Sequence, residues 1–351
     1  PLGSDIPYPR GTPHRSRGVR FTNSSFVPLL KAILIPIHFF FPMAISKILS
    51  SALLLLISTV CIADEPEIVA AANRIITTVP VAVTDKTTSI SGNPHNYESL
   101  SIYWWPDSLN PSGPYIARDG HYNPEYRKYD YPRLLALVKN ISTVGNAYLY
   151  TKETKYYNYL CKQIDTWFIN KNTLMLPNFE YCQFIPGRNN GKGNPQGLID
   201  AYNFNTIIDV IANVDEHSPI GEKRLAALKK WMKKFAKWME TSPNGITASQ
   251  YKNNQAIAYE TTLYNIYTFI GKEKKAQRHA RTCIKHISEQ IQEDGKQPEE
   301  LRRTKALSYS IYNIEHIEYF LQKYGTSNIE NNILSKISKA KQYINKLKEQ
   351  K

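Results

Sequence analysis

The chain has 351 residues, of which 42% are hydrophobic and 21% are charged, and it carries a formal net charge of +14. This composition excludes a disordered polar chain and predicts an ordinary globular core. The positive charge predicts attraction to a polyanion, such as nucleic acid, an anionic membrane or an acidic polysaccharide, but it does not choose among them.

The first part of the chain is expected to lie outside the folded domain. Residues 1–42 are expected to be disordered: PLGS is typical of a cloning remnant, and the rest is interpreted as an upstream extension. Residues 43–63 have the pattern of a signal peptide, with a positive charge, an apolar run and a small residue before the cleavage site. A transmembrane anchor over residues 26–63 is the competing interpretation, although three prolines interrupt its first half. We therefore expect a secreted or periplasmic protein without stable membrane insertion after processing.

Most of the remaining chain shows the apolar spacing of amphipathic helices. Clear stripes cover residues 225–238, 256–270, 280–291 and 307–317, and weaker ones cover 65–79, 130–151, 153–169 and 198–213. Turn sequences such as TSPNG, EDGKQP and YGTSN separate the later stripes. The succession of amphipathic helices predicts an all-α fold, and no fixed-period repeat supports a superhelical array of them. We expect an (α/α) toroid, or incomplete barrel of paired helices, as a single domain over residues 64–351.

Two stretches, residues 85–128 and 171–197, lack this periodicity and are rich in Asn, Gly, Pro and aromatic residues. Long loops without regular structure in a compact domain are usually functional. The sequence SIYWWPDSLN at 101–110 places three large aromatic residues on such a loop, where flat apolar faces with a polar edge suit a sugar. The alternative is that Trp104 and Trp105 only close the end of the core.

The cysteine pattern does not indicate a metal site. Cys161, Cys182 and Cys283 follow the expected signal peptide, without CxxC spacing and without a Cys/His cluster. We therefore expect no metal and no cofactor. One disulfide, between Cys161 and Cys182, is compatible with export, but the spacing does not establish it.

Four segments together carry a resemblance to a known family. They are YESLSIYWWPDSLNPSGPYIARDGHYNPE (97–125), LPNFEYCQFIPGRNNGKGNPQGLID (176–200), YKNNQAIAYE (251–260) and DGKQPEELRRTKALSYSIYNIEHI (294–317). In this order, over roughly residues 66–325, they resemble the alginate lyase family of helical-toroid polysaccharide lyases. The resemblance implies an (α/α) barrel with a cleft at one end. It also implies cleavage of an anionic uronic-acid polymer by β-elimination, without a cofactor.

The chemistry of β-elimination requires three roles. A donor must neutralise the sugar carboxylate and stabilise enolate-like charge, a base must remove the C5 proton, and an acid must protonate O4. Amide and guanidinium groups suit the first role. A tyrosine can fill the other two where nearby cations lower its pKa from about 10.

The resemblance assigns these roles to particular residues. It implies that Tyr309 is the catalytic tyrosine and that Arg303 and Asn254 bind the carboxylate. Arg302 is a rival for Arg303, because it lies seven residues before Tyr309 and on a continuous helix would share its face. Lys305, four residues before Tyr309, is expected to depress the pKa of the phenol.

Other residues are placed in the cleft by the family pattern. The residues expected to bind substrate are Tyr103, Trp104, Asn178, Tyr181, Gln183, Arg188, Arg302, Lys305 and Tyr312. Two simpler interpretations remain open. Tyr309 could be an ordinary core or surface tyrosine, one of 24 in the chain, and the pair Asn253–Asn254 could be no more than a helix N-cap.

One position departs from the family pattern. The second Asn of the pair is usually followed by His, whereas this chain has Gln255, whose amide does not titrate near neutrality. Gln255 is expected to join Asn254 and Arg303 in holding the carboxylate, which leaves Tyr309 alone to move protons. The sequence therefore predicts syn elimination on β-D-configured uronans, polymannuronate or glucuronan.

Two other functions remain open from the sequence. A helical-toroid glycoside hydrolase would need paired carboxylic acids, for which Asp119, Glu299 and Glu300 are candidates without a recognisable paired context. A non-catalytic protein that binds acidic polysaccharide is the second, and the substitution at Gln255 favours it. Nucleic-acid binding is the weakest interpretation, because the chain contains no known nucleic-acid module.

Overall fold

The computed structural model describes residues 67–118 and 121–349. Residues 71–349 belong to one compact unit, while residues 67–70 are counted with a second unit whose other residues lie outside the described part. The expected signal peptide at 43–63, the extension at 1–42 and Asp119 also lie outside it, so these remain predictions. No helix in the described ranges combines the length and apolarity needed to cross a membrane.

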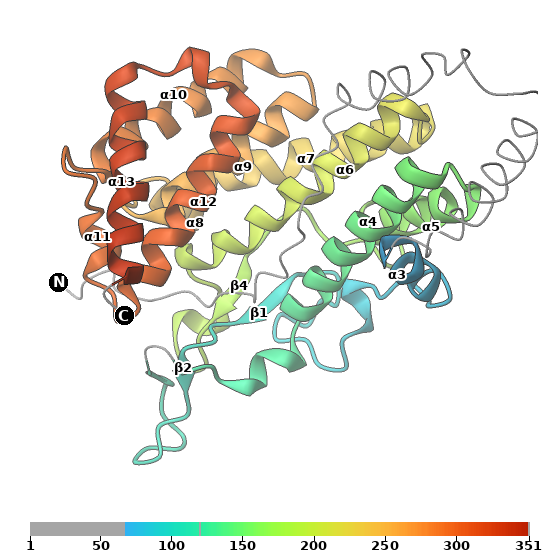
Figure 1. Cartoon of the computed structure of the whole chain (residues 1–351). Helices are drawn as coiled ribbons and strands as arrows, with labels where there is room; N and C mark the ends of the chain where they lie inside the picture. Colours follow the sequence, from blue (N-terminus) through green and yellow to red (C-terminus); the bar gives the residue numbers. More distant parts are fainter. Residues whose placement is uncertain (1–66, 119–120, 350–351) are drawn as a thin grey trace, which may run out of the picture. The chain divides into compact units, whose positions relative to one another are not determined.

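The described chain is mainly α-helical (Figure 1). Its helices are α3 (Glu67–Ile75), α4 (Tyr131–Thr151), α5 (Thr154–Ile164), α6 (Phe204–His217), α7 (Glu222–Thr241), α8 (Pro243–Ala248), α9 (Asn254–Phe269), α10 (Glu273–Gln290), α11 (Pro298–Leu301), α12 (Ala306–Tyr324) and α13 (Asn331–Glu349). Consecutive helices pack as pairs: α4 lies against α5, α9 against α10, and α12 against α13. Helix α9 also packs on α6, α7 and α12, and nearly all its side chains are buried, so it is a central element of the fold.

Short turns join the helices within each pair. Lys152 ends α4 in the left-handed conformation, with φ of 62°, and its N–H donates to the Tyr148 carbonyl. Gly271, with φ of 70°, makes the turn from α9 to α10, where a side chain would be strained. Such turns allow successive helices to pack against each other.

The two aperiodic stretches form short strands and 3₁₀ turns rather than helices. Strand β1 (Glu98–Leu100) pairs in parallel with β4 (Tyr181–Phe184), which ties the first stretch to the second. Strand β2 (Trp104–Trp105) pairs antiparallel with β3 (Ile116–Ala117). Hydrogen bonds therefore hold both long loops in defined positions.

An aromatic cluster forms part of the core under these loops. The rings of Phe204 and Phe235 meet at 5.1 Å, and Trp231 lies 5.3 Å from Phe235. Phe179, from the second aperiodic stretch, packs 5.0 Å from Phe235 and is fully buried. Burial of each such ring contributes about 1.5–3 kcal/mol, so the loop that carries Phe179 is anchored on the helices.

Some boundaries differ from those expected. The helix predicted at 153–169 ends at Ile164 and continues as a π-helical turn over Asp165–Ile169. The segment 198–203 belongs to a 3₁₀ stretch, Pro195–Asn203, that precedes α6. Helices α8, α11 and α13 were not predicted.

The disulfide considered between Cys161 and Cys182 is not formed. Both cysteines are free thiols buried in the core, and Cys283 is a third. Cys161 lies on α5, while Cys182 lies on β4, where its Sγ is 3.8 Å from the Asn194 carbonyl.

Candidate active site

Tyr309 lies in the first turn of α12 and is almost fully buried. Its N–H donates to the Lys305 carbonyl at 3.1 Å, and its side chain is 5% exposed. The ring packs against Ile199 and Ala258, with Tyr202 and Tyr312 at the edge of the same cluster. These contacts come from three elements and hold the phenol in a fixed position.

Arg303 is the cation nearest to this ring among the cation–ring contacts of the described residues. Its guanidinium carbon lies 4.2 Å from the centre of the Tyr309 ring. One guanidinium nitrogen, Nη2, is buried and has no hydrogen-bond partner in the structure. A buried charged donor without a partner is rare and indicates a place for an anionic ligand.

Arg302 points elsewhere. Its side chain is 69% exposed and pairs with Glu299. Arg302 and Tyr309 do not share the face of a continuous helix, because α11 ends at Leu301 and α12 begins only at Ala306. The intervening turn directs one arginine to solvent and the other onto the phenol.

Lys305 immediately precedes α12, and its carbonyl accepts the Tyr309 N–H at 3.1 Å. Its backbone is the N-cap of the helix, and its Nζ lies 5.8 Å from the Tyr122 ring. A direct effect of this ammonium on Tyr309 remains a prediction.

The N-terminus of α9 contributes a second group of polar residues. Asn253 is the N-cap, and its Oδ1 accepts from the Gln255 N–H at 3.1 Å. The capping interpretation therefore holds for Asn253 but not for Asn254, which is fully buried and donates to Glu300. Asn254 Oδ1 and Gln255 Oε1 are buried without a hydrogen-bond partner.

Tyr103 reaches Tyr309 from the first long loop. Burial, together with the neighbouring hydroxyls of Tyr309 and Tyr122, raises the pKa of Tyr103 well above its usual value. The Tyr103 and Tyr122 rings lie 5.3 Å apart. Tyr103 therefore connects the first loop with Tyr309.

Trp104 and Arg188 join the two long loops. The Arg188 guanidinium carbon lies 4.7 Å from the centre of the Trp104 ring, and Trp104 is 8% exposed. The indole Nε1 is buried without a partner. An exposed arginine on an aromatic face offers the contacts that an acidic sugar requires.

The remaining loop residues are less directly connected with the site. Gln183 is buried, and its Nε2 donates to Asp200 at 2.9 Å, so its amide supports the loop. Asn178 Oδ1 accepts from the Glu180 N–H in a local turn. Tyr181 is half-buried on β4. No contact recorded in the described ranges joins these three to Tyr309.

Asp200 is the centre of a buried hydrogen-bond network that fixes this loop. It accepts from Tyr97, Ser99 and Gln183 at 2.8–2.9 Å. Burial raises the pKa of Asp200 to about 6 against the effect of these donors. The network joins both aperiodic stretches beneath the candidate site.

His316 was not expected near the site. Its ring lies 4.1 Å from the rings of both Tyr202 and Tyr312, and it is 1% exposed. Neither ring nitrogen has a partner within hydrogen-bond distance, and burial lowers the pKa of His316 to about 3 against a smaller opposing effect of the Asn254 backbone. The imidazole is therefore neutral at physiological pH. Its spacing of seven residues from Tyr309 was the signal that could have identified it.

Of the carboxylates considered for hydrolysis, the two in the described ranges have separate partners. Glu299 is bound to Arg302 at the surface, and Glu300 is buried against Asn254. Within residues 67–118 and 121–349, no group of three or more His, Cys, Asp or Glu side chains could hold a metal ion.

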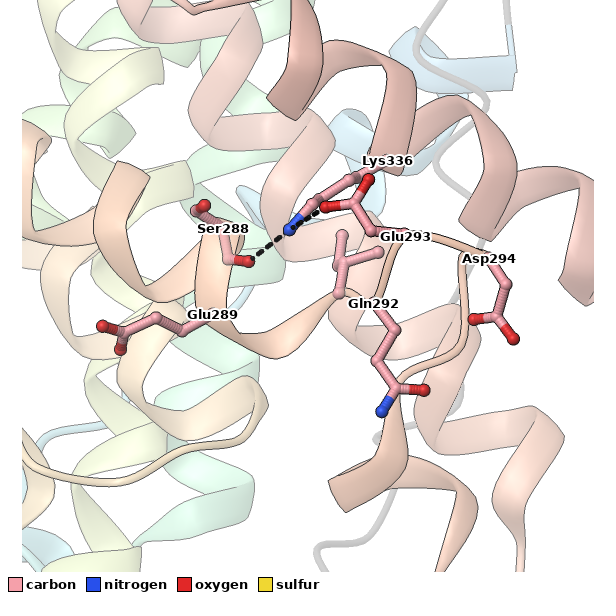
Figure 2. A pocket seen from close by; sticks show the side chains of 7 residues that line it. Ser288, Glu289, Gln292, Glu293, Asp294 and Lys336 are labelled. Carbon is pink, nitrogen blue, oxygen red and sulfur yellow. Dashed lines mark hydrogen bonds and ion pairs between the residues drawn. The ribbon is translucent and has the colours of Figure 1, made fainter.

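A surface hollow between the α10–α11 loop and α13 is unsuited to binding a polyanion (Figure 2). Its lining includes the carboxylates of Glu289, Glu293 and Asp294, and Lys336 is engaged with Glu293 at 3.0 Å. Several carboxylates with one neutralised cation would repel a polyanion.

Comparisons with known proteins concern the family and the fold of the chain. A family model described as alginate lyase matches residues 82–330. An alginate lyase from Bacteroides ovatus is 32% identical in sequence, with a TM-score of 0.74, and the match covers 80% of this chain and 78% of that one. A tyrosine-to-phenylalanine variant of alginate lyase A1-III, complexed with a tetrasaccharide, has a TM-score of 0.51 at 16% identity over 81% and 78%. No match was found among curated protein sequences.

The second of these similarities concerns the fold alone. The first, together with the family model, confirms the expected fold class, an all-α toroid of paired helices. The chain belongs to the alginate lyase family, and it is a polysaccharide lyase.

Proposed function

We propose that this lyase cleaves a β-D-uronic-acid polymer, polymannuronate or glucuronan, by syn β-elimination. The net charge of +14 favours an anionic polymer. The tetrasaccharide bound by the related alginate lyase A1-III variant also supports a saccharide substrate.

The observation that carries the proposal is the position of Arg303 over the Tyr309 ring, 4.2 Å from its centre. A cation this close stabilises a phenolate relative to the phenol and so favours a tyrosine base. The same guanidinium retains a buried Nη2 donor for the substrate carboxylate. Arg303 thus serves both the Tyr309 base and the substrate carboxylate next to which the C5 proton is removed.

Asn254 and Gln255 complete the proposed carboxylate site. Both lie in the first turn of α9, where the helix dipole favours negative charge. Their amide groups supply donors that do not change charge during the reaction. Such donors stabilise developing charge because they are already oriented towards it.

The reaction balances with Tyr309 alone. The phenolate oxygen takes the C5 proton, the released electron pair forms the C4–C5 double bond, and the bond from C4 to the glycosidic oxygen breaks. Tyr309 then donates the same proton to that oxygen. In β-D-mannuronate and β-D-glucuronate the two atoms leave from one side of the ring, so one tyrosine can reach both.

Tyr103, Trp104 and Arg188 are proposed to bind neighbouring sugars. Tyr103 meets Tyr309, and Trp104 carries Arg188 on its face. Residues 43–63 are proposed to be a signal peptide, which sequencing the N-terminus of the secreted protein tests. If residues 26–63 were needed for a soluble fold, the signal-peptide proposal would be overturned.

Initial rates on separate polymers test the proposed reaction. Polymannuronate, polyguluronate, glucuronan and glycosaminoglycans are incubated with the enzyme, and ultraviolet absorbance is followed. Elimination creates an unsaturated product that absorbs, whereas hydrolysis creates reducing ends without this absorbance. We expect absorbance from the β-D polymers.

A further inference from the structure

Glu300 is a buried carboxylate, and within the described ranges each hydrogen bond recorded to its oxygens comes from Asn254 of the proposed site. Asn254 donates its backbone N–H to Oε1 at 2.8 Å, and its Nδ2 lies 3.0 Å from Oε1 and 2.9 Å from Oε2. Glu300 is 1% exposed. Burial raises its pKa, while the Asn254 donors and the charge of Arg303 oppose this rise.

This contact fixes the orientation of the Asn254 amide. Nδ2 faces both oxygens of Glu300, whereas Oδ1 of the same amide is buried without a hydrogen-bond partner. The two oxygens of one carboxylate lie in nearly the same direction from Nδ2, whereas the two amide hydrogens diverge. One N–H therefore serves both oxygens, and the other remains available for a further acceptor.

Three buried amide side chains, which we call the amide frame (Gln290, Gln297 and Asn313), hold Glu300 and Asn254 together. Asn313 donates to Gln297 at 2.9 Å and to Gln290 at 3.2 Å. Gln290 donates to the Asn253 carbonyl at 3.0 Å, just before Asn254. Gln297 is the N-cap of the short helix α11 that carries Glu300.

The frame closes a ring through α9, α10, α11 and α12. Its three members are at most 7% exposed. The frame joins the start of α9 to α10, α10 to α12, and α12 to the start of α11, and the Asn254–Glu300 contact closes the ring between α11 and α9. Buried polar networks hold a local geometry through their paired groups, and in this frame Asn313 Oδ1 is a buried atom without a partner.

We propose that Glu300 is a positioning residue of the elimination reaction. It holds Asn254 with one amide N–H directed at the substrate carboxylate, where negative charge increases in the transition state. Glu300 itself makes no contact with the sugar and transfers no proton. The inference rests on the proposed function, since it assigns Asn254 to the carboxylate site.

A double-mutant cycle tests this role. Glu300→Gln removes the charge and places an amide N–H opposite Nδ2, so kcat is expected to fall by about 10²-fold, the scale of a misplaced catalytic contact. Asn254→Ala is expected to lower kcat similarly. If Glu300 acts through Asn254, the double variant is no slower than Asn254→Ala. Rate losses that multiply, or Glu300→Gln kinetics within twofold of wild type, would overturn the proposal.

Two further variants serve as a control and as a substitute in this cycle. Glu318→Gln alters an exposed glutamate on the outer part of α12 and is expected to leave kcat unchanged. If Glu300→Gln does not fold, Glu300→Asp enters the same cycle, because it keeps the charge and shortens the reach.

Calorimetric binding of mannuronate and glucuronate oligosaccharides distinguishes a failure of the proposed function from a failure of the proposed role of Glu300. A wild type that binds but forms no unsaturated product would contradict the proposed function. The affinities of wild type, Glu300→Gln, Asn254→Ala and the double variant then test the role of Glu300 separately. Non-additive losses of affinity support positioning, and additive or absent losses overturn it.

Discussion

The guanidinium of Arg303 lies over the ring of Tyr309, 4.2 Å from its centre, while the adjacent Arg302 turns to solvent and pairs with Glu299. The break between α11 and α12 separates the two arginines. This contact joins the group proposed to move protons with a group proposed to hold the carboxylate.

Tyr309→Phe is expected to abolish most activity and preserve the fold. The change removes one hydroxyl and little volume, so packing against Ile199 and Ala258 should persist. Turnover should fall by about 10²-fold or more, the scale of a lost general acid or base. Tyr150→Phe, at a tyrosine that is 57% exposed on α4, is the matched control. Activity near wild type in Tyr309→Phe would move the assignment to another tyrosine.

The two arginines should differ sharply in their effects. Arg303→Lys keeps a charge but loses the planar donor over the ring, so kcat/KM should fall by about tenfold or more. Arg302→Ala should change kcat/KM little, because an exposed ion pair contributes about 0–1 kcal/mol. Steady-state kinetics on one polymer checks both. The reverse order of effects would assign the carboxylate to Arg302.

His316 should make the protein sensitive to acid. Its folded pKa of about 3 lies below the ordinary value of 6.5, so the unfolded state binds a proton between these pH values and the folded state does not. Stability is therefore retained above pH 6.5 and lost as pH falls towards 3, by on the order of a few kcal/mol.

The variant His316→Phe keeps a planar ring between Tyr202 and Tyr312 and removes the proton-binding group. Urea unfolding at pH 7 and pH 4 should show a smaller loss of stability for this variant than for wild type. Comparing the two proteins cancels the opposite contribution of Asp200, whose raised pKa of about 6 favours folding as pH falls through that value. An equal loss in both proteins would show that His316 does not carry the effect.

The variant Gln255→His tests why this chain is expected to prefer one sugar configuration. In α-L-guluronate the C5 proton and the O4 group leave from opposite faces, so a second base is needed. A histidine at position 255, in the first turn of α9, is expected to supply it and to increase the rate on polyguluronate. An unchanged ratio of polyguluronate to polymannuronate rates would mean that position 255 does not set this preference.

Periodicity predicted much of the fold. The stripes at 225–238, 256–270, 280–291 and 307–317 fall on α7, α9, α10 and α12. Helix α13 was missed although Ile333, Ile337 and Ile344 have helical spacing and are buried. The short helices α8 and α11 contain too few residues for a periodic signal.

The site was less predictable where tertiary contacts decide it. Tyr309 and Asn254 could be identified from motifs, but which arginine faces the phenol depends on a turn that interrupts the helix. The bond between Glu300 and Asn254 spans 46 positions and has no local signal. His316 could be connected with the site only through its spacing of seven residues from Tyr309.

Initial rates of absorbance increase on pure polymannuronate, glucuronan and polyguluronate test the central claim most directly. The single-tyrosine mechanism predicts elimination on polymannuronate or glucuronan and little or none on polyguluronate, because Tyr309 can reach the proton and the leaving oxygen only from one face of the ring. Polyguluronate as the preferred substrate would contradict it.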